Sequence, residues 1–154
     1  MIVVSDTSCI TGLIAIHREQ LLQQLFGTVI IPPAVREELG VAHAILPDYL
    51  ETRTPLETVA VARLLLEPLD PGEAEAMVLV EELHADYLLI DETAGRKIAE
   101  ARGILHFGLL GVLSRAKEKG IIAQLRPELD ALINTGFRIA PRLRERFLSD
   151  IGEA

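Results

Sequence analysis

The feature that most constrains the fold of this chain is a repeated succession of short apolar runs and helix-start signals. Residues 2–4, 28–31 and 87–90 are rich in Val, Ile and Leu, which is typical of strands buried on both faces. Each run is soon followed by residues that begin helices, such as Asp6 and the Pro32-Pro33 pair. Strands that alternate with helices predict an α/β fold with a parallel sheet covered on both sides.

Helix signals fill most of the remaining chain. The helices that we expect cover residues 6–17, 21–26, 32–39, 56–66, 70–83, 93–102, 108–119, 125–134 and 141–148. The glycines expected to end four of them are Gly27, Gly40, Gly103 and Gly120. Further short strands are expected near residues 49–54 and 105–107. With 154 residues and no internal repeat, the sequence predicts one domain, residues 1–154, with a mostly parallel central sheet of 4–5 strands between two helical layers.

The composition excludes several classes of protein. No apolar run approaches the roughly 20 residues needed to span a membrane, and the N-terminus lacks the basic region of a signal peptide. Cys9 is the only cysteine, which excludes an intrachain disulfide and a cysteine-based zinc site, and we expect a cytoplasmic, reducing compartment. The four histidines are widely spaced and match no zinc pattern.

The charge of the chain is unevenly distributed. Residues 1–94 carry 4 Lys and Arg against 16 Asp and Glu, a net charge of −12, whereas residues 95–154 carry 11 against 7, a net charge of +4. The basic part could approach a polyanion while the acidic part holds a metal. A solvated basic helix explains the same numbers, and a pI near 5 argues against bulk binding of nucleic acid.

Four acidic residues stand where a metal site would need them. Asp6 and Asp91 follow two of the predicted strands, and the carboxyl ends of parallel strands meet at one crevice. Glu38 lies late in the helix after the second strand, and Glu73 lies in the first turn of its helix, where the helix dipole favours an anion. We therefore expect these four carboxylates to converge.

A cluster of carboxylates is repulsive unless a cation neutralises it, and hard oxygen ligands suit Mg²⁺ or Mn²⁺. Each acid also has a purely structural interpretation. Asp6 and Asp91 could cap the helices that follow them, Glu38 could be a solvated helix residue, and Glu73 could be a first-turn acid. Only their joint placement favours a metal site.

The residues around these acids carry a resemblance to a known family. The motifs are Val4-Ser5-Asp6-Thr7-Ser8, residues 31–39, Gly72-Glu73-Ala74-Glu75-Ala76, Leu89-Ile90-Asp91-Glu92 with Gly95-Arg96, and the closing Ala116-Lys117 and Gly136-Phe137-Arg138-Ile139. Each is short, but their order and spacing together resemble the PIN domain, and more narrowly its VapC-like branch of toxin ribonucleases. The closing segment is similar to a poorly characterised PIN-like subgroup.

The resemblance implies a single PIN-like α/β/α domain with an endoribonuclease activity that depends on Mg²⁺ or Mn²⁺. It implies RNA as substrate, a cognate antitoxin protein as partner and a homodimer, with no membrane. By position, Asp6, Glu38, Glu73 and Asp91 would be the catalytic and metal-binding acids.

The sequence departs from the family pattern at the third acid, which is usually Asp. Glu73 is preferred there over Glu75, which would lie about 200° around the helix. Glu92 competes with Asp91 in the fourth motif. Thr7 or Ser8 could hydrogen-bond a ligand or a phosphate, and Arg96 could clamp a phosphate through its planar fork, although helix capping and a solvated arginine explain these residues too.

Three rival functions follow from the same residues. A phosphatase with an aspartyl nucleophile would need an acid at Ser8, and a receiver domain would need paired acids after the first strand and a lysine after the last. Both patterns are missing. The third rival is a PIN fold that no longer cleaves and serves as a binding or assembly module, which the glutamate substitution keeps open.

Overall fold

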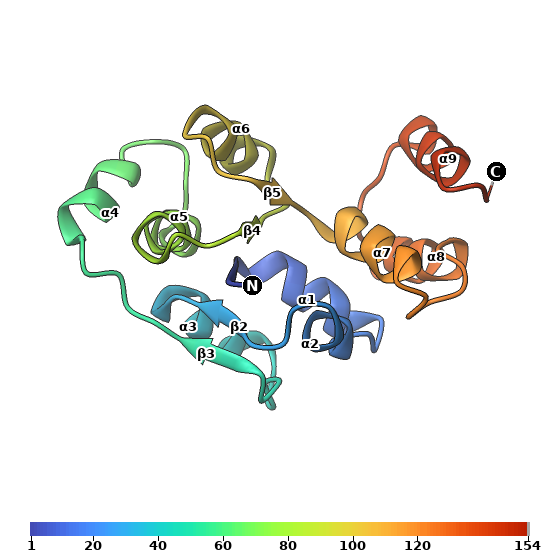
Figure 1. Ribbon diagram of the computed structural model, residues 1–154, viewed down its shortest axis with the longest axis horizontal. Coiled ribbons are helices and arrows are strands. Elements are labelled where there is room, and N and C mark those ends of the chain that lie inside the picture. Colours follow the sequence, from blue (N-terminus) through green and yellow to red (C-terminus); the bar gives the residue numbers. More distant parts are fainter. Residues whose placement is uncertain (154) are drawn as a thin grey trace.

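The central element of the fold is a five-stranded parallel sheet. The computed structural model describes residues 1–153. The strands are β1 (Val3–Ser5), β2 (Val29–Ile31), β3 (Leu50–Thr52), β4 (Tyr87–Leu89) and β5 (His106–Phe107). They lie in the order β3-β2-β1-β4-β5, and every pairing is parallel (Figure 1). The predicted α/β class and the number of strands are confirmed, and the sheet is wholly rather than mostly parallel.

Helices connect and cover these strands. They are α1 (Thr7–Ala15), α2 (Gln20–Phe26), α3 (Pro33–Ala42), α4 (Thr58–Leu64), α5 (Pro71–Leu83), α6 (Thr93–Ala101), α7 (Leu109–Glu118), α8 (Arg126–Asn134) and α9 (Pro141–Asp150). Within residues 1–153, no helix is both long and apolar enough to cross a bilayer.

Side chains alternate between the two faces of the sheet, as the pleat of a strand requires. Val3 and Leu89 point into a core built with α1, α2, α3, α7 and α8, whereas Val4 and Leu88 point into a second core built with α4, α5 and α6. These four residues are fully buried. Both faces are therefore covered, which gives the expected three layers.

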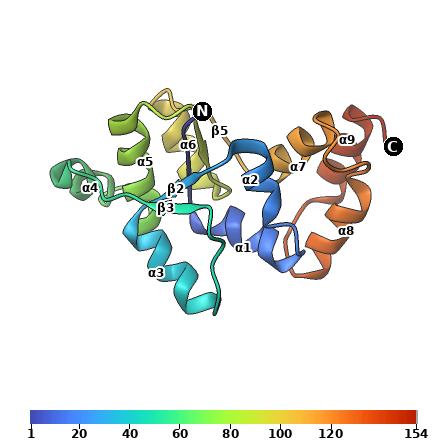
Figure 2. The same ribbon diagram turned by 60° about the horizontal axis from the view of Figure 1, so that its bottom comes forward.

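The C-terminal helices form an extension at one end of the molecule. Both ribbon views show α7, α8 and α9 side by side at the end opposite α4 (Figures 1 and 2). Glu153 fastens this extension, because its carboxylate accepts hydrogen bonds from Lys117 Nζ at 2.6 Å and from the Leu125 N–H at 2.8 Å.

Three of the four predicted glycine stops are confirmed. Gly27, Gly103 and Gly120 follow α2, α6 and α7 with φ of 74°, 71° and 73°, a conformation that glycine adopts without steric cost. Gly40 is the exception, because α3 continues through it to Ala42. Glycine is tolerated within a helix at a cost of about 1 kcal/mol, so a glycine alone does not end one.

Candidate active site

The site is built where the direction of the chain across the sheet reverses. From β1 the chain proceeds to β2 and β3 on one side, and β4 and β5 lie on the other. In open α/β sheets, ligands bind beyond the carboxyl ends of the strands at such a switch point. Ser5 of β1 pairs with Leu89 of β4, so Asp6 and Asp91 leave the sheet next to each other.

Asp6 is 3% exposed and serves as the N-cap of α1. Its carboxylate accepts hydrogen bonds from the Cys9 N–H at 3.3 Å and from Ser8 Oγ at 3.0 Å. Burial raises the pKa of Asp6 to about 7, against the lowering effect of these hydrogen bonds and with a further rise from the charge of Asp91. The capping interpretation of Asp6 is therefore correct, but a buried carboxylate next to a second one also favours a bound cation.

Asp91 is held by contacts from two other helices. Its carboxylate accepts a hydrogen bond from the Leu109 N–H at 3.2 Å, at the N-terminus of α7, and from Cys9 Sγ at 3.4 Å. Burial, followed by the charges of Asp6 and Asp91, raises the pKa of the Cys9 thiol, so the thiol stays protonated and donates. Asp91 does not cap α6, because Glu92 occupies the N-cap position.

Glu73 is 6% exposed, and its carboxylate both caps α5 and belongs to the site. Its Oε1 accepts from the Asp70 N–H at 3.0 Å, while Asp70 Oδ1 accepts from the Glu73 N–H at 2.8 Å, which forms a capping box. Glu73 Oε2 is buried without a hydrogen-bond partner in the described chain. Burial raises the pKa of Glu73, and the charges of Asp70 and Glu92 raise it further.

Glu38 is exposed on α3 and reaches toward the start of α5. A methyl group on Gly72 would lie 2.8 Å from Glu38 Oε1, so the glycine allows this approach. Partial burial and the charge of Asp70 raise the pKa of Glu38. Glu38 thus belongs to the same group of acids as Glu73 and Asp70.

These acids line a cavity of about 310 Å³, which we call the acid pocket. Its walls are Asp6, Thr7, Ser8, Thr11, Glu38, Asp70, Gly72, Glu73 and Glu92. Asp91 lines an adjoining cavity of about 600 Å³ that shares Ser8, Thr11 and Glu92 with the acid pocket. Three of the four predicted acids therefore face one pocket, and the fourth lies at its border.

Three glycines adjoin three of the predicted acids. Besides the contact of Gly72 with Glu38, a methyl group on Gly95 would lie 2.8 Å from Glu73 Oε2, and one on Gly108 would overlap Asp91 Oδ1. Each glycine leaves room for a carboxylate that a larger residue would displace. No local pattern in the sequence predicts this arrangement.

Two further acids of the pocket were not predicted as members of the set of four. Asp70 begins the predicted helix over residues 70–83, and its Asp-x-x-Glu spacing to Glu73 is typical of the capping box that holds both residues together. Glu92 was a competitor of Asp91 and lines both cavities. Glu75 is not among the residues that line the pocket, and its carboxylate accepts from the Ala34 N–H at 3.5 Å.

The donors fit a hard divalent cation by their chemistry, since all are oxygens and two buried ones, Thr7 Oγ1 and Glu73 Oε2, have no hydrogen-bond partner in residues 1–153. Within those residues, no three Asp, Glu, His or Cys side chains are close enough to hold a metal together. Mg²⁺ does not require such a cage, because it is usually bound by one or two carboxylates with several waters and substrate phosphates.

The fold and the site together define the class: an α/β protein with a parallel sheet and a group of carboxylates at the switch point of that sheet. A family model of the PIN domain matches residues 2–153. The chain therefore belongs to the PIN domain family, whose members are nucleases as a class. No curated protein and no solved structure matches the chain.

Proposed function

We propose that this protein is a ribonuclease that depends on Mg²⁺ or Mn²⁺ and hydrolyses phosphodiester bonds of RNA. The observation that carries the proposal is the placement of Asp6 and Asp91 at the carboxyl ends of adjacent parallel strands, next to a pocket lined by Glu38 and Glu73. The membership in the PIN domain family supports a nuclease activity in general.

The residues of the chain would act mainly by holding a divalent ion and by orienting water. Asp6 and Asp91 are the best anchored acids, since hydrogen bonds from α1 and from the N-terminus of α7 fix their carboxylates. Glu38 and the free oxygen of Glu73 would complete the set or orient water. A bound divalent ion would neutralise charge on the phosphate and lower the pKa of a bound water.

We further propose that the ribonuclease is the toxin of a toxin–antitoxin pair that acts in the cytoplasm as a homodimer. This finer assignment rests on the resemblance to the VapC-like branch. The single buried Cys9 is consistent with a reducing compartment.

A second function, a PIN fold that binds or assembles without cleaving, is favoured by one observation. Glu73 uses one oxygen in the capping box, which leaves it a single oxygen for a metal. In that case, the acid pocket would not bind a divalent ion strongly.

Cleavage of a labelled single-stranded RNA by the purified protein tests the proposal. We expect cleavage in Mg²⁺ or Mn²⁺, none in a chelator, and a loss of about 100-fold or more in Asp6→Asn and Asp91→Asn. Glu38→Gln should also lower cleavage, whereas Glu37→Gln should not, because Glu37 is the neighbouring exposed residue on α3 and lies outside the acid pocket. Undiminished cleavage by either aspartate variant would refute the proposal.

A further inference from the structure

The cavity that adjoins the acid pocket is a groove between the carboxyl ends of the strands and the C-terminal extension. It has a volume of about 600 Å³. Asp91 and Glu92 line it on the side of the acids, and Thr135, Phe137, Arg138 and Ile139, in the link between α8 and α9, line it on the other. Leu143 of α9 and Arg96 of α6 also contribute, and we call this cavity the arginine groove. It continues from the acid pocket, because both contain Ser8 and Thr11.

Two cations of the arginine groove are free to bind a ligand. Arg96 and Arg138 are exposed, and within residues 1–153 neither guanidinium takes part in an ion pair or a side-chain hydrogen bond. Guanidinium groups bind phosphate oxygens through two parallel hydrogen bonds. The groove therefore offers phosphate contacts beside acids that by themselves repel a phosphate.

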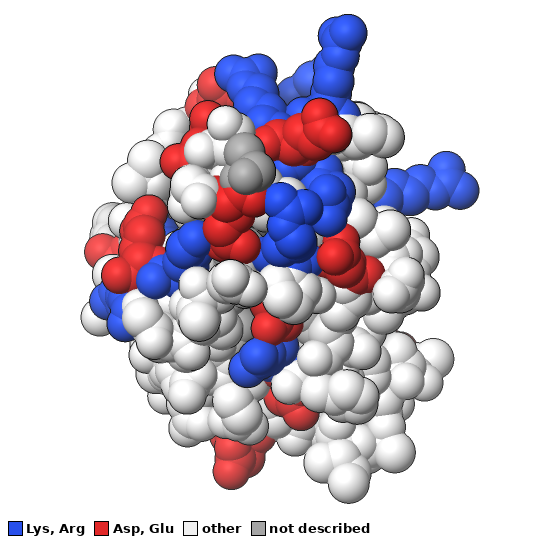
Figure 3. Space-filling view, turned by 90° about the vertical axis from the view of Figure 1, so that its right-hand side faces the viewer, with Lys and Arg blue, Asp and Glu red and all other residues white. Residues whose placement is uncertain are grey.

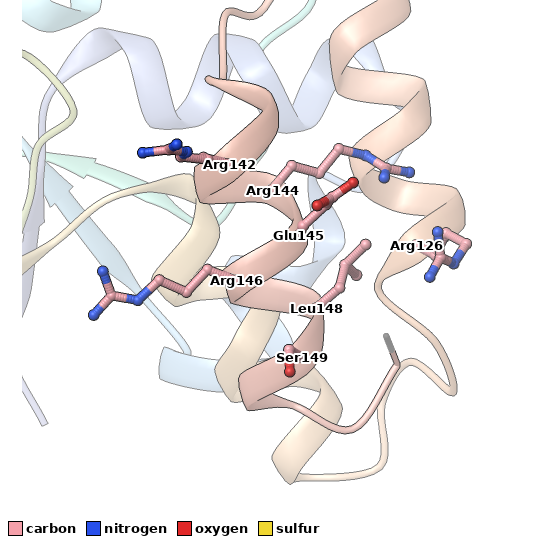
Figure 4. A pocket seen from close by; sticks show the side chains of 7 residues that line it. All are labelled: Arg126, Arg142, Arg144, Glu145, Arg146, Leu148 and Ser149. Carbon is pink, nitrogen blue, oxygen red and sulfur yellow. The ribbon is translucent and has the colours of Figure 1, made fainter.

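A second arginine-rich cavity, of about 490 Å³, lies on α8 and α9. Two of its guanidinium groups are engaged, since Arg144 binds Asp130 at 2.6 Å and Arg126 binds the Glu153 carbonyl at 2.5 Å. Arg142 and Arg146 project to one side of α9 (Figure 4). Basic and acidic side chains are interleaved over this end of the molecule (Figure 3), so the surface attracts a phosphate backbone less uniformly. The second cavity also shares no lining residue with the acid pocket.

The arginine groove also has an apolar side. Phe137 and Ile139 are half-buried, and Leu110 and Leu143 also line the groove. An aromatic ring next to arginines is the usual platform for unpaired bases, because a base stacks on the ring while the arginines bind the backbone. A cavity of this size is in the range that encloses small ligands, so it admits unstacked nucleotides and not a duplex.

We propose that the arginine groove binds the single-stranded RNA next to the phosphodiester at the acid pocket. Arg96 and Arg138 hold backbone phosphates that flank the reacting one, and Phe137 stacks on a base. The inference rests on the proposed function, since it assumes RNA as the ligand, and it makes the C-terminal extension a part of the substrate site.

Fluorescence anisotropy of a labelled single-stranded RNA tests the groove separately from cleavage. All variants are made in the Asp6→Asn background, so that no RNA is consumed. We expect Arg96→Gln with Arg138→Gln to weaken binding at least tenfold and to reduce the slope of log affinity against log salt by about 1.4, or about 0.7 for each phosphate that an arginine no longer neutralises. Phe137→Ala should weaken binding by about fivefold or more without changing the salt slope.

The matched controls are Lys97→Gln and Lys119→Gln, which remove the same charge from exposed positions outside the groove. They should bind within about twofold of the parent. Unchanged binding in the double arginine variant would overturn the inference. A larger loss of RNA binding in Arg142→Gln with Arg146→Gln than in the groove variants would also overturn the inference, because the RNA would then cross α9.

Failure of the groove and failure of the proposed function give different results. For cleavage, the groove substitutions are also made in the wild-type chain. If the wild-type protein cleaves RNA and the groove substitutions change neither cleavage in that chain nor binding in the Asp6→Asn background, the groove inference is wrong and the ribonuclease stands. If the groove variants lose binding but the wild-type protein does not cleave in Mg²⁺ or Mn²⁺, the groove is supported and the ribonuclease is wrong.

Discussion

Asp6 and Asp91 are joined through one residue, because Cys9 donates its backbone N–H to Asp6 and its thiol to Asp91. Cys9 and Asp91 are 82 residues apart in the sequence, yet the strands that precede the two acids are adjacent in the sheet. α1 begins at Asp6, so the geometry of the helix start sets the separation of the carboxylates. The site therefore depends on the first turn of α1 as much as on the sheet.

The first prediction concerns pH and stability in the absence of divalent ions. Because burial raises the pKa of Asp6 from 3.8 to about 7, the native state binds a proton that the unfolded state releases. The contribution of Asp6 to stability should be complete below about pH 4 and disappear as pH rises to about 7, by at most about 4 kcal/mol. Asp6→Asn keeps a capping side chain, so in a chelator it should unfold at a higher temperature than the wild type at pH 8 and at a similar one at pH 4.

Thermal unfolding of both proteins across this pH range measures the effect. Added Mn²⁺ should stabilise the wild type at pH 8 and leave Asp6→Asn unchanged, because an ion that binds only the native state stabilises it. An Asp6→Asn variant that is less stable than the wild type at pH 8 in the chelator would contradict the assignment of a buried carboxylate with a raised pKa.

The second prediction concerns Gly108, whose substitution should displace the Asp91 carboxylate. The added methyl group would overlap Asp91 Oδ1 and lie 3.3 Å from the Ile90 carbonyl oxygen, so the side chain must move. We expect Gly108→Ala to lower cleavage by about 100-fold, the size of effect that a misplacement of about 1 Å produces. Gly40→Ala is the control, because nothing lies near its added methyl group and alanine favours the helix by about 1 kcal/mol. Comparable activity in the two variants would be inconsistent with this role of Gly108.

The third prediction concerns the thiol of Cys9 as a positioning group for Asp91. Loss of a partner that orients a ligand typically costs about 10–100-fold in affinity or activity, so we expect about a tenfold loss for Cys9→Ala. Cys9→Ser retains a donor and should keep more of the activity. The Mn²⁺ dependence of cleavage separates this role from a packing defect, since only a positioning role raises the metal concentration that gives half the maximal rate.

The fourth prediction concerns the attachment of the C-terminal extension. Burial raises the pKa of Glu153, but hydrogen bonds from the Leu125 N–H, Lys117 and the Arg126 N–H outweigh it and lower the pKa to about 2. The stability from Glu153 should therefore be complete above about pH 4.5 and be lost as pH falls toward 2. At pH 7, Glu153→Gln should lower the free energy of unfolding by about 1–2 kcal/mol, because solvent screens part of the interaction. Chemical denaturation of the wild type and Glu153→Gln at pH 7 and pH 3 measures this effect. An equal difference in the free energy of unfolding between the two proteins at both pH values would argue against a role of the ionised Glu153 carboxylate.

Much of the fold follows from local signals that the sequence displays directly. The apolar runs at β1, β2 and β4 alternate between two cores, and Asp70 with Pro71 begins α5 as predicted. The ends of helices follow less directly from the sequence, since α3 continues through Gly40 to Ala42 although that glycine was expected to end the helix. Tertiary packing decides such positions, and no local pattern reveals them.

The candidate site was predictable to a lesser extent. The strand ends identified Asp6 and Asp91, because their place depends only on β1, β4 and the parallel order of the sheet. The pairing of Glu38 with Gly72 and of Glu73 with Gly95 depends instead on how α3, α5 and α6 pack. The arginine groove was not predictable, since its far wall is a link between two helices that is distant in the sequence from Asp91.

A calorimetric titration with Mn²⁺ tests the central claim, that Asp6 and Asp91 form one cation site, most directly. We predict saturable binding to the wild-type protein and to the Glu37→Gln control, and none to Asp6→Asn or Asp91→Asn when all four are folded. Equal binding by the wild type and either aspartate variant, or no binding by the wild type at millimolar Mn²⁺, would contradict it.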